Sequence, residues 1–369
     1  MSLSSLSRLF RVELAPPAYL AQKAAGVDIS MSGIKFVTLK ETRAGLVLDS
    51  CGERHLPPGV FVNGDIVEPA VLTKELSLMA KEFNIRAANV SLPEAKSYLF
   101  DAQVPTDTGV PQTKESWRVA VEQHLEEYVP LPPREVTFDL APFPGNAHPG
   151  MVAGVGYAHR VIDETVVAVS AAGIAVQSLE PEMYALARAV IPAESTETVL
   201  IADIGKTTTK LVVTEGRIPR FATTLAIGGH ALTLAVQKHF GVSEADARRI
   251  KVTRGLSGGE DGDEYVAALL GTAAALKEEI ARRLDYWQTH VTTTPGLSPI
   301  ARVSLVGGNA SLAGLPEYLS AGLGMPVALA DVFRNFAPRT AWLPPLEYSE
   351  SLAYGSAIGL ALREYTYDA

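Results

Sequence analysis

Two short stretches of the chain share one pattern of apolar and polar positions. Residues 200–213, LIADIGKTTTKLVV, consist of an apolar strand that ends near Asp203, a bend of small and polar residues, and a second apolar strand. Residues 26–40, GVDISMSGIKFVTLK, repeat this order, with Asp28 near the end of the first strand. A duplicated half-domain is the simplest explanation of two such hairpins in one chain.

The last quarter of the chain has a pattern typical of alternating strands and helices. The sequence predicts a buried strand over 303–306, a turn at Gly307, Gly308 and Asn309, a helix with leucines near helical spacing, and a strand over 327–329. The closing stretch ESLAYGSAIGLALREY predicts a helix whose small residues allow close packing. Together with the two hairpins, this order indicates an α/β protein.

Composition limits the possible functions. The chain has 369 residues, of which 47% are hydrophobic and 20% charged, and this is typical of a globular protein with two domains. Its net charge of −9 argues against nucleic-acid binding. A single cysteine, Cys51, cannot form an internal disulfide, and the sequence lacks both an export signal and a long apolar run. We therefore expect a cytosolic protein.

The two bends have the composition of phosphate-binding loops. Small residues let backbone N–H groups point at a phosphate, hydroxyls add donors, and an aspartate at the strand end can hold the hydrated metal ion that accompanies the phosphates. An ordinary turn explains either bend alone equally well. Because the pattern occurs twice, however, we favour two loops that face each other and clamp one polyphosphate.

Several segments, taken in chain order, resemble the actin-like ATPase superfamily, which includes actin, the Hsp70 ATPase domain and FtsA. They are LEPEMYALARA, ADIGKTTTK, GGHALT, ADARRIK, LVGGNASLAGL and SLAYGSAIGLAL. Within this superfamily, the chain from about residue 24 onward is similar to the PilM family of type IV pilus assembly proteins. The most diagnostic segment for that family is WRVAVEQHLEEYVPLPPREVTFDLAPFP, residues 117–144.

The resemblance implies an α/β fold of the actin-like, duplicated ribonuclease H-like ATPase type with an inserted small α/β subdomain. It implies five parts: an N-terminal tail, 1–23, partly disordered; a first core subdomain, 24–100 plus 170–195; the inserted partner-binding subdomain, 101–169; a second core subdomain, 196–228 plus 295–369; and an outer helical subdomain, 229–294.

The resemblance also assigns a site for ATP and Mg²⁺. The implied nucleotide-binding residues are Asp28, Ser30, Ser32, Gly33, Lys35, Asp203, Gly205, Lys206, Thr207, Thr208, Gly228, Gly229, Asp246, Arg249, Gly307, Gly308 and Asn309, with Asp28 and Asp203 near the metal ion. Ser30 occupies a position where the family usually has glycine, and a Cβ there crowds the phosphates if φ is positive. Lys206 occupies a position usually held by a small residue, where it either adds a cation or points to solvent. A surface ion pair explains Asp246 and Arg249 as well as ribose contact does.

The pair Glu180-Pro181 matches a Glu-Pro pair that in Hsp70-type relatives lies near the attacking water. The resemblance therefore names Glu180 as the catalytic candidate, although a proline in the first helical turn is also an ordinary way to begin a helix. Since the unusual Ser30 and Lys206 disturb the alignment of the phosphates, we expect at most slow ATP hydrolysis.

The resemblance implies a scaffold rather than a metabolic enzyme. Such a scaffold binds the tail of a PilN-like membrane protein, contacts the pilus platform and motor proteins, lies at the cytoplasmic face of the inner membrane, and self-associates only weakly. An FtsA-like membrane tether and a small-molecule kinase of the sugar-kinase branch are the alternatives. A sugar kinase needs a carboxylate base dedicated to its substrate, and we find no motif for one.

Overall fold

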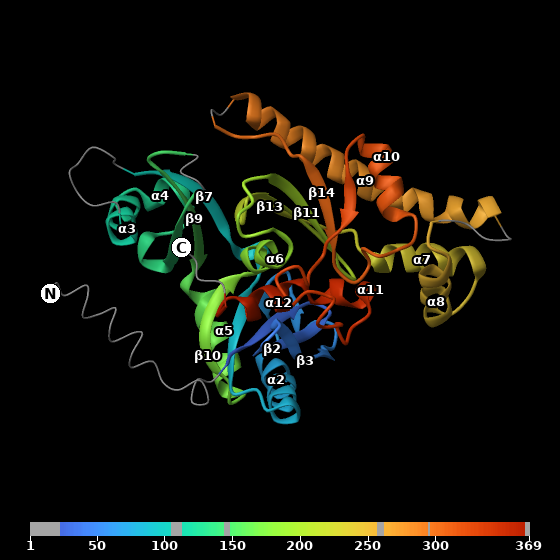
Figure 1. Ribbon diagram of the computed structural model, residues 1–369, viewed down its shortest axis with the longest axis horizontal. Coiled ribbons are helices and arrows are strands. Elements are labelled where there is room, and N and C mark those ends of the chain that lie inside the picture. Colours follow the sequence, from blue (N-terminus) through green and yellow to red (C-terminus); the bar gives the residue numbers. More distant parts are fainter. Residues whose placement is uncertain (1–22, 105–112, 144–147, 257–261, 294–295, 366–369) are drawn as a thin grey trace.

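A computed structural model of the chain describes residues 23–104, 113–143, 148–256, 262–293 and 296–365 (Figure 1). Almost all of the predicted N-terminal tail, 1–23, lies outside these residues. Within them, none of the helices combines the length and the apolar character that crossing a bilayer requires.

The first large sheet has five strands in the order β10-β6-β1-β2-β3. Their bounds are β1 Ala25–Ser30, β2 Gly33–Thr42, β3 Gly45–His55, β6 Ala87–Leu92 and β10 Ala175–Pro181. Strands β1, β2 and β3 are antiparallel, whereas β6 and β10 run parallel to β1. Helices α2 (Pro69–Phe83) and α5 (His159–Ala171) pack together against this sheet, and the two-residue strands β4 (Phe61–Val62) and β5 (Asp65–Ile66) form a small ribbon beside it.

The second large sheet repeats the topology of the first. Its order is β13-β12-β11-β14-β15, with bounds β11 Thr198–Ile204, β12 Thr209–Glu215, β13 Ile218–Leu225, β14 Arg302–Val306 and β15 Val327–Leu329. Again three antiparallel strands are followed by two parallel ones. The predicted hairpins are β1–β2 and β11–β12, so the repeat seen in the sequence corresponds to a repeat in the fold.

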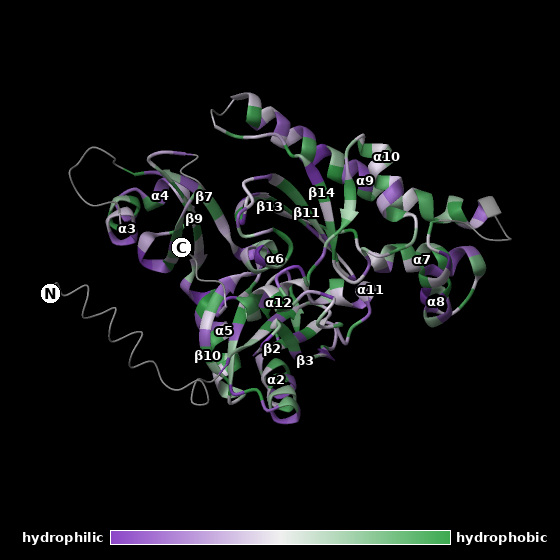
Figure 2. Cartoon of the chain, viewed as in Figure 1, coloured by the Kyte–Doolittle hydropathy of each residue, from purple (hydrophilic) through white to green (hydrophobic). Residues whose placement is uncertain are grey.

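Two short helices lie between the large sheets. Helix α6 (Glu182–Val190) packs against α12 (Gly355–Leu362), every residue of which is buried. The backbone of α12 approaches its neighbours closely at two glycines. A Cβ on Gly359 of α12 would lie 1.7 Å from the carbonyl O of Ala185 in α6, and a Cβ on Gly26 of β1 would lie 2.0 Å from the carbonyl O of Ala357 in α12. Figure 2 shows α12 as mostly hydrophobic. The small residues of the closing stretch therefore allow the close packing that the sequence predicts.

A third sheet, β7-β9-β8, forms a separate layer at one end of the molecule (Figure 1). Its elements are β7 Tyr98–Gln103, α3 Lys114–Glu122, α4 Leu125–Tyr128, η2 Pro133–Glu135, β8 Val136–Pro142 and β9 Met151–Ala158. We call residues 98–158 the insertion, because they separate β6 from α5 of the first core. The third sheet starts at Tyr98, three residues before the predicted start of the insertion at residue 101. Helix α5 falls mostly inside the predicted range but packs on α2 of the first core. The predicted bounds 101–169 stay a prediction.

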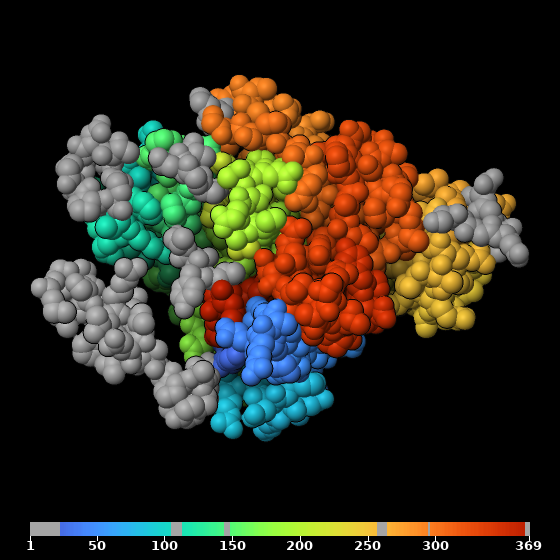
Figure 3. Space-filling model, in the orientation of Figure 1, coloured from blue at the N-terminus to red at the C-terminus, as the bar shows by residue number. Residues whose placement is uncertain are grey.

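The remaining helices follow β13 in the chain, and among them α10 packs on β15 of the second sheet. They are α7 Gly229–Phe240, α8 Glu244–Arg254, α9 Gly262–Thr293, α10 Leu315–Leu323 and α11 Tyr348–Ser351, with the short 3₁₀ turns η1 Glu94–Lys96 and η4 Leu352–Tyr354 elsewhere. Helices α7 and α8 project at the end of the molecule opposite the insertion, as the gold and teal atoms of Figure 3 show.

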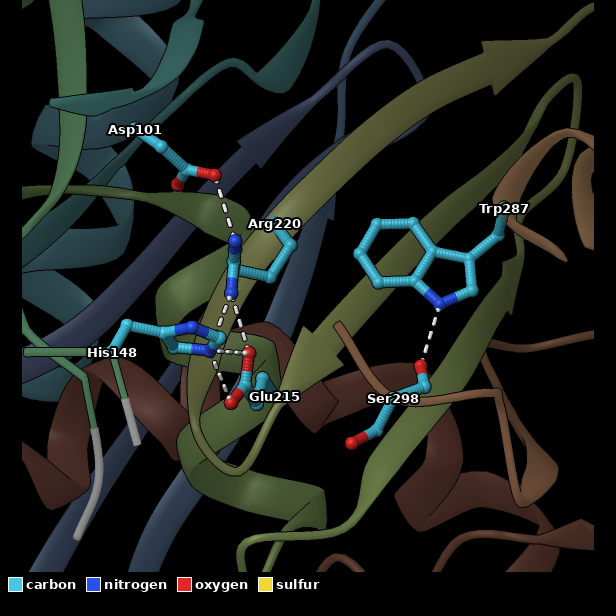
Figure 4. Close-up of polar contacts among 6 residues, drawn as sticks. All are labelled: Asp101, His148, Glu215, Arg220, Trp287 and Ser298. Carbon is cyan, nitrogen blue, oxygen red and sulfur yellow. Dashed lines mark hydrogen bonds and ion pairs between the residues drawn. The ribbon is translucent and has the colours of Figure 1, made fainter. Parts of the chain in front are cut away.

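A buried ionic network joins the insertion to the second core (Figure 4). The guanidinium of Arg220, on β13, donates to Asp101 of β7 at 2.7 Å and to Glu215 of β12. His148, which precedes β9, contacts both Glu215 carboxylate oxygens at 2.8 and 2.9 Å. The Arg220 side chain is only 3% exposed and lies 4.2 Å from the ring centroid of Phe143. One arginine thus neutralises carboxylates from two parts of the fold.

Replacing Arg220 with methionine should destabilise the protein, because Glu215 stays buried and loses its cationic partner. Removal of one member of a buried ion pair costs about 3–5 kcal/mol, and we expect Arg220→Met to lower the free energy of unfolding by about that amount in a denaturant titration. Arg160, 58% exposed and paired with Asp65 and Glu164, provides the control. Arg160→Met should cost less than about 1 kcal/mol; equal losses in the two variants would contradict the importance of the network.

Candidate functional site

A cavity of about 760 Å³ lies between the two hairpins. Fourteen of the predicted nucleotide-binding residues line it: Asp28, Ser30, Ser32, Gly33, Lys35, Asp203, Gly205, Lys206, Thr207, Thr208, Gly229, Gly307, Gly308 and Asn309. They come from both halves of the duplicated fold. The structure therefore brings together most of the residues that the sequence analysis selected.

The two hairpins place the same residue types at matching positions. In the first, Asp28 of β1 is the cross-strand partner of Lys35; in the second, Asp203 of β11 is the partner of Lys210. Each aspartate thus lies close to the bend, with a lysine opposite it. The Oδ1 atom of Asp28 is buried and has no hydrogen-bond partner among the described residues, so it is available to a bound group.

The first bend is held by hydroxyl contacts and by one glycine. Ser30 Oγ donates to the carbonyl O of Gly33 at 3.1 Å and lies 3.1 Å from Ser32 Oγ. Gly33 has φ +153°, and a Cβ there would lie 2.4 Å from the carbonyl O of Arg54. Ser30 is not among the described residues with positive φ, so the crowding considered for its Cβ does not arise from a left-handed backbone.

The second bend is held mainly by backbone hydrogen bonds. The N–H of Gly205 donates to the carbonyl O of Thr208 at 2.9 Å, and the carbonyl O of Gly205 accepts from the N–H of Gly229 at 3.0 Å. The N–H of His230 reaches the carbonyl O of Lys206 at 2.7 Å. Gly228 does not line the cavity; it caps α7 behind the bend, where a Cβ would lie 2.6 Å from the backbone of Thr207.

A lysine that the sequence pattern does not indicate lies in the cavity wall beside the second bend. Lys251 of α8 donates to the carbonyl O of Gly229 at 3.0 Å and to Asn309 Oδ1 at 2.8 Å. Burial, followed by the nearby Arg248 charge, lowers the pKa of Lys251 to about 8. Asn309 also donates to the carbonyl O of Gly205 at 2.9 Å. Lys251 therefore connects α7, α8 and the turn after β14.

Asp246 and Arg249 lie outside the cavity. They form an exposed ion pair of 3.0 Å on α8, with side chains 49% and 76% exposed. The α8 residues that line the cavity are instead Glu244, Arg248, Lys251 and Val252. The helical period explains this difference, because Asp246 and Arg249 lie one or two positions from the lining residues Glu244, Arg248 and Lys251, and such positions face different sides of a helix. The surface ion-pair interpretation of Asp246 and Arg249 is the one the structure supports.

Glu180 also lies outside the cavity. Its carboxylate pairs with Arg188, and with Arg363 at 3.1 Å, and is only 4% exposed. Glu182, two residues later, lines the cavity and forms an ion pair with Lys210. Strand β10 continues through Pro181 and α6 begins at Glu182, so the first helical residue is the one that faces the hairpins. The carboxylate that lines the cavity at this point is therefore that of Glu182 rather than that of Glu180.

Charges at the base of the cavity influence one another. Burial raises the pKa of Glu182 to about 7, which Lys210 opposes and Asp28 and Asp203 reinforce. Burial also raises the pKa of Asp203. For Lys210 burial acts downward, but Glu182, Asp203 and Asp28 outweigh it and raise the pKa. We call these four residues the charge cluster.

The cavity offers donors to phosphate oxygens and carboxylates to a hydrated cation. Two bends of small residues, with exposed Thr207 and Lys206, offer donors to phosphate oxygens. Among the described residues, no three histidine, cysteine, aspartate or glutamate side chains are close enough together to hold a metal ion. The predicted metal residues, Asp28 and Asp203, lie with Glu182 around the ammonium of Lys210. The carboxylates outnumber this ammonium, so the base of the cavity can attract a further, hydrated cation.

Comparisons with known proteins agree with this architecture. A family model described as type IV pilus assembly protein PilM matches residues 26–365. A solved PilM–PilN type IV pilus biogenesis complex is similar to the chain with a TM-score of 0.73 and 25% identity, over 94% of this chain and 99% of that one.

Two more distant structures share the fold. The ethanolamine utilization protein EutJ from Carboxydothermus hydrogenoformans has a TM-score of 0.52 and 16% identity, over 97% of this chain and 96% of its own. MreB5 of Spiroplasma citri bound to AMPPNP has a TM-score of 0.51 and 12% identity, over 94% and 97%. The predicted actin-like α/β fold is confirmed.

The lowered pKa of Lys251 predicts a pH-dependent contribution to stability. Between about pH 8 and the ordinary value of 10.5, the unfolded chain binds a proton that the folded chain lacks, so the stability contributed at this position rises with pH. We expect the free energy of unfolding of the wild type, minus that of Lys251→Met, to increase across this window and to be constant below it. Denaturant titrations at a series of pH values measure the difference; a flat difference would contradict the lowered pKa.

Proposed function

Because the chain belongs to the PilM family of type IV pilus assembly proteins, we propose that it is an ATP-binding scaffold that docks the tail of a PilN-like membrane protein. One observation carries the nucleotide part: the two halves of a duplicated fold present matching bends across a single cavity. In this proposal the bends bind the phosphates, while Lys251, Gly308 and Asn309 border the adenosine. MreB5, which has the same fold, is described with ADP and with AMPPNP.

We propose that the protein binds ATP but hydrolyses it slowly at most. Water activation requires a carboxylate that is free to accept a proton within reach of the γ-phosphate. The two candidates are both engaged: Glu180 with Arg188 and Arg363, and Glu182 with Lys210. At most slow hydrolysis follows. The sequence shows no motif for a carboxylate base dedicated to a sugar, which favours a scaffold over a sugar kinase. Family membership favours a scaffold over an FtsA-like tether.

We propose that the partner tail lies along the junction between the first core and the insertion. Leu92, Val155, Tyr157 and Val161 form a small buried apolar cluster there, and apolar residues that are only partly buried, including Ile162, pack around it. In this proposal the partly exposed residues contact the apolar side chains of an extended peptide. Through that partner the protein would lie at the cytoplasmic face of the inner membrane, next to the pilus platform and motor proteins, with only weak self-association.

A bulky side chain at Gly308 should block nucleotide binding without unfolding the protein. A Cβ at this position meets only Ala353 Cβ, at the ordinary contact distance of 3.5 Å, and the residue borders the cavity. We expect Gly308→Phe to weaken ATP binding at least tenfold in a calorimetric titration. Gly271 of α9 has nothing within 4 Å of its Cβ position and lies outside the cavity, so Gly271→Phe is the matched control. Unchanged affinity in a folded Gly308→Phe variant would overturn the nucleotide site.

A charge at the junction should weaken binding of the partner tail. We expect Ile162→Asp to lower the affinity for a PilN-like tail peptide at least tenfold in fluorescence anisotropy, because the peptide's apolar side chains would face a carboxylate. Leu343, 77% exposed and outside the insertion, provides the control Leu343→Asp.

A second variant separates the junction from a different face of the insertion. A cavity of about 390 Å³ lies between β7, β13 and α9, where Tyr286 is 45% exposed. Loss of peptide binding in Tyr286→Asp, together with retention in Ile162→Asp, would move the docking site to that cavity and contradict the junction.

A further inference from the structure

A row of polar residues crosses the second sheet from the second bend to the sheet edge. Asp203 of β11 and Lys210 of β12 are cross-strand partners, and Lys210 is also the partner of Thr224 on β13. Cross-strand partners project from the same face of a sheet, and all three residues line the nucleotide cavity. Because β13 is the outermost strand of this sheet, the row reaches its edge at Thr224.

Glu94, the first residue of η1, continues the row beyond the sheet edge. The hydroxyl of Thr224 donates to Glu94 Oε2, and Glu94 is only 8% exposed. Glu94 also lines the second cavity, the one of about 390 Å³ between β7, β13 and α9. Among the described residues, it is the one that both cavities share. Glu94 therefore lies between the two cavities.

The turn η1 is attached to the surface proposed for the partner tail. Leu92, two residues before Glu94, belongs to the apolar cluster at the junction. The hydroxyl of Tyr157, in the same cluster, donates to the carbonyl O of Pro93 at 3.1 Å. Ser97 Oγ donates to the carbonyl O of Glu94 at 2.7 Å, immediately before β7 begins. A displacement of Glu94 therefore shifts residues of both the junction and the insertion.

A phosphate bound in the nucleotide cavity competes with Glu94 for Thr224. A threonine hydroxyl has one proton to donate, and Glu94 accepts it here. Thr224 is exposed and lines the cavity, so a phosphate oxygen can accept the same proton. Glu94 would then be a buried carboxylate that lacks this donor and faces a further negative charge, and both effects are unfavourable. Each of them drives the carboxylate away from the nucleotide cavity.

We propose that Thr224 and Glu94 are positioning residues that couple the two sites: a bound phosphate displaces Glu94, shifts η1, and weakens binding of the partner tail. The tail binds best when Thr224 holds Glu94 as it does in this structure. The effect is reciprocal, because two ligands that influence each other's affinity do so by the same factor. The inference rests on the nucleotide and tail sites proposed above and adds how one regulates the other.

Binding of the tail with and without nucleotide tests the coupling. The affinity of the full chain for a PilN-like tail peptide is measured by fluorescence anisotropy, without nucleotide and with saturating AMPPNP and MgCl₂. We expect AMPPNP to lower the wild-type affinity by about fivefold or more, within the usual range of coupling between sites.

Two conservative variants test the residues. Thr224→Val removes the donor, so tail binding should already be weak without nucleotide, and AMPPNP should change it less than about twofold. Glu94→Gln keeps the acceptor but removes the charge, so tail binding should stay strong without nucleotide and fall less with AMPPNP than in the wild type. Thr223 is the next residue inward on β13 and is not among those that line either cavity, so Thr223→Val is the control and should behave as the wild type.

The outcomes separate this inference from the proposed function. A wild type that binds both ligands, each with an affinity that the other leaves unchanged, would overturn the coupling and leave both sites intact. A wild type that fails to bind AMPPNP in calorimetry, or fails to bind the peptide, would overturn the corresponding site and the inference with it. Undiminished coupling in Thr224→Val would overturn the role of Thr224.

Hydrogen exchange gives a readout that does not need the peptide. The N–H groups of Lys96 and Ser97 donate to the carbonyl O atoms of Pro93 and Glu94, at 3.2 and 2.9 Å. AMPPNP should speed the exchange of these two amides in the wild type, because the turn that protects them shifts, and should leave it unchanged in Thr224→Val. Unchanged exchange in a wild type with AMPPNP bound would overturn the displacement of Glu94.

Discussion

The backbone contact between α6 and α12 sets the spacing of the whole molecule. Because Gly359 approaches the carbonyl of Ala185 too closely for any side chain, the two helices lie nearly in backbone contact between the large sheets. The hairpins β1–β2 and β11–β12 belong to different sheets, and their distance across the cavity depends on this packing. A fold built by duplication can hold a ligand between its halves only if such a contact fixes how far apart the halves lie.

Charged residues of α6 form ion pairs and hydrogen bonds in the core, one of them with α12. Helix α6 begins with Glu182 in the cavity, and its last turn carries Arg188, which binds Glu180 and the carbonyl O of Gly359. The buried glutamates Glu180 and Glu182 are thus each paired with an arginine or a lysine. Since an unpaired buried charge is costly, these pairs restrict how the halves can be arranged.

The sequence was sufficient to predict the two hairpins, but not to predict which face of a helix lines the cavity. Asp28 and Asp203 follow strands and precede bends, so local pattern alone locates them at the cavity. Which residues of α8 face the cavity depends on how that helix packs, so the sequence pattern indicates Asp246 and Arg249 and not Lys251. Likewise, only the point at which β10 gives way to α6 distinguishes Glu182 from Glu180. The repeated order of Asp and Lys in both hairpins was a visible signal for Lys210.

The Arg220 network has a mechanical consequence. In chain order the insertion belongs to the first core, yet Asp101 and His148 bind β12 and β13 of the second. A rigid-body rotation of one core against the other would therefore pull directly on these ionic contacts. Either they break, or the insertion travels with the second core and the strain passes to its connections with β6 and α5. The insertion thus links the two cores, through the chain to the first and through ionic contacts to the second.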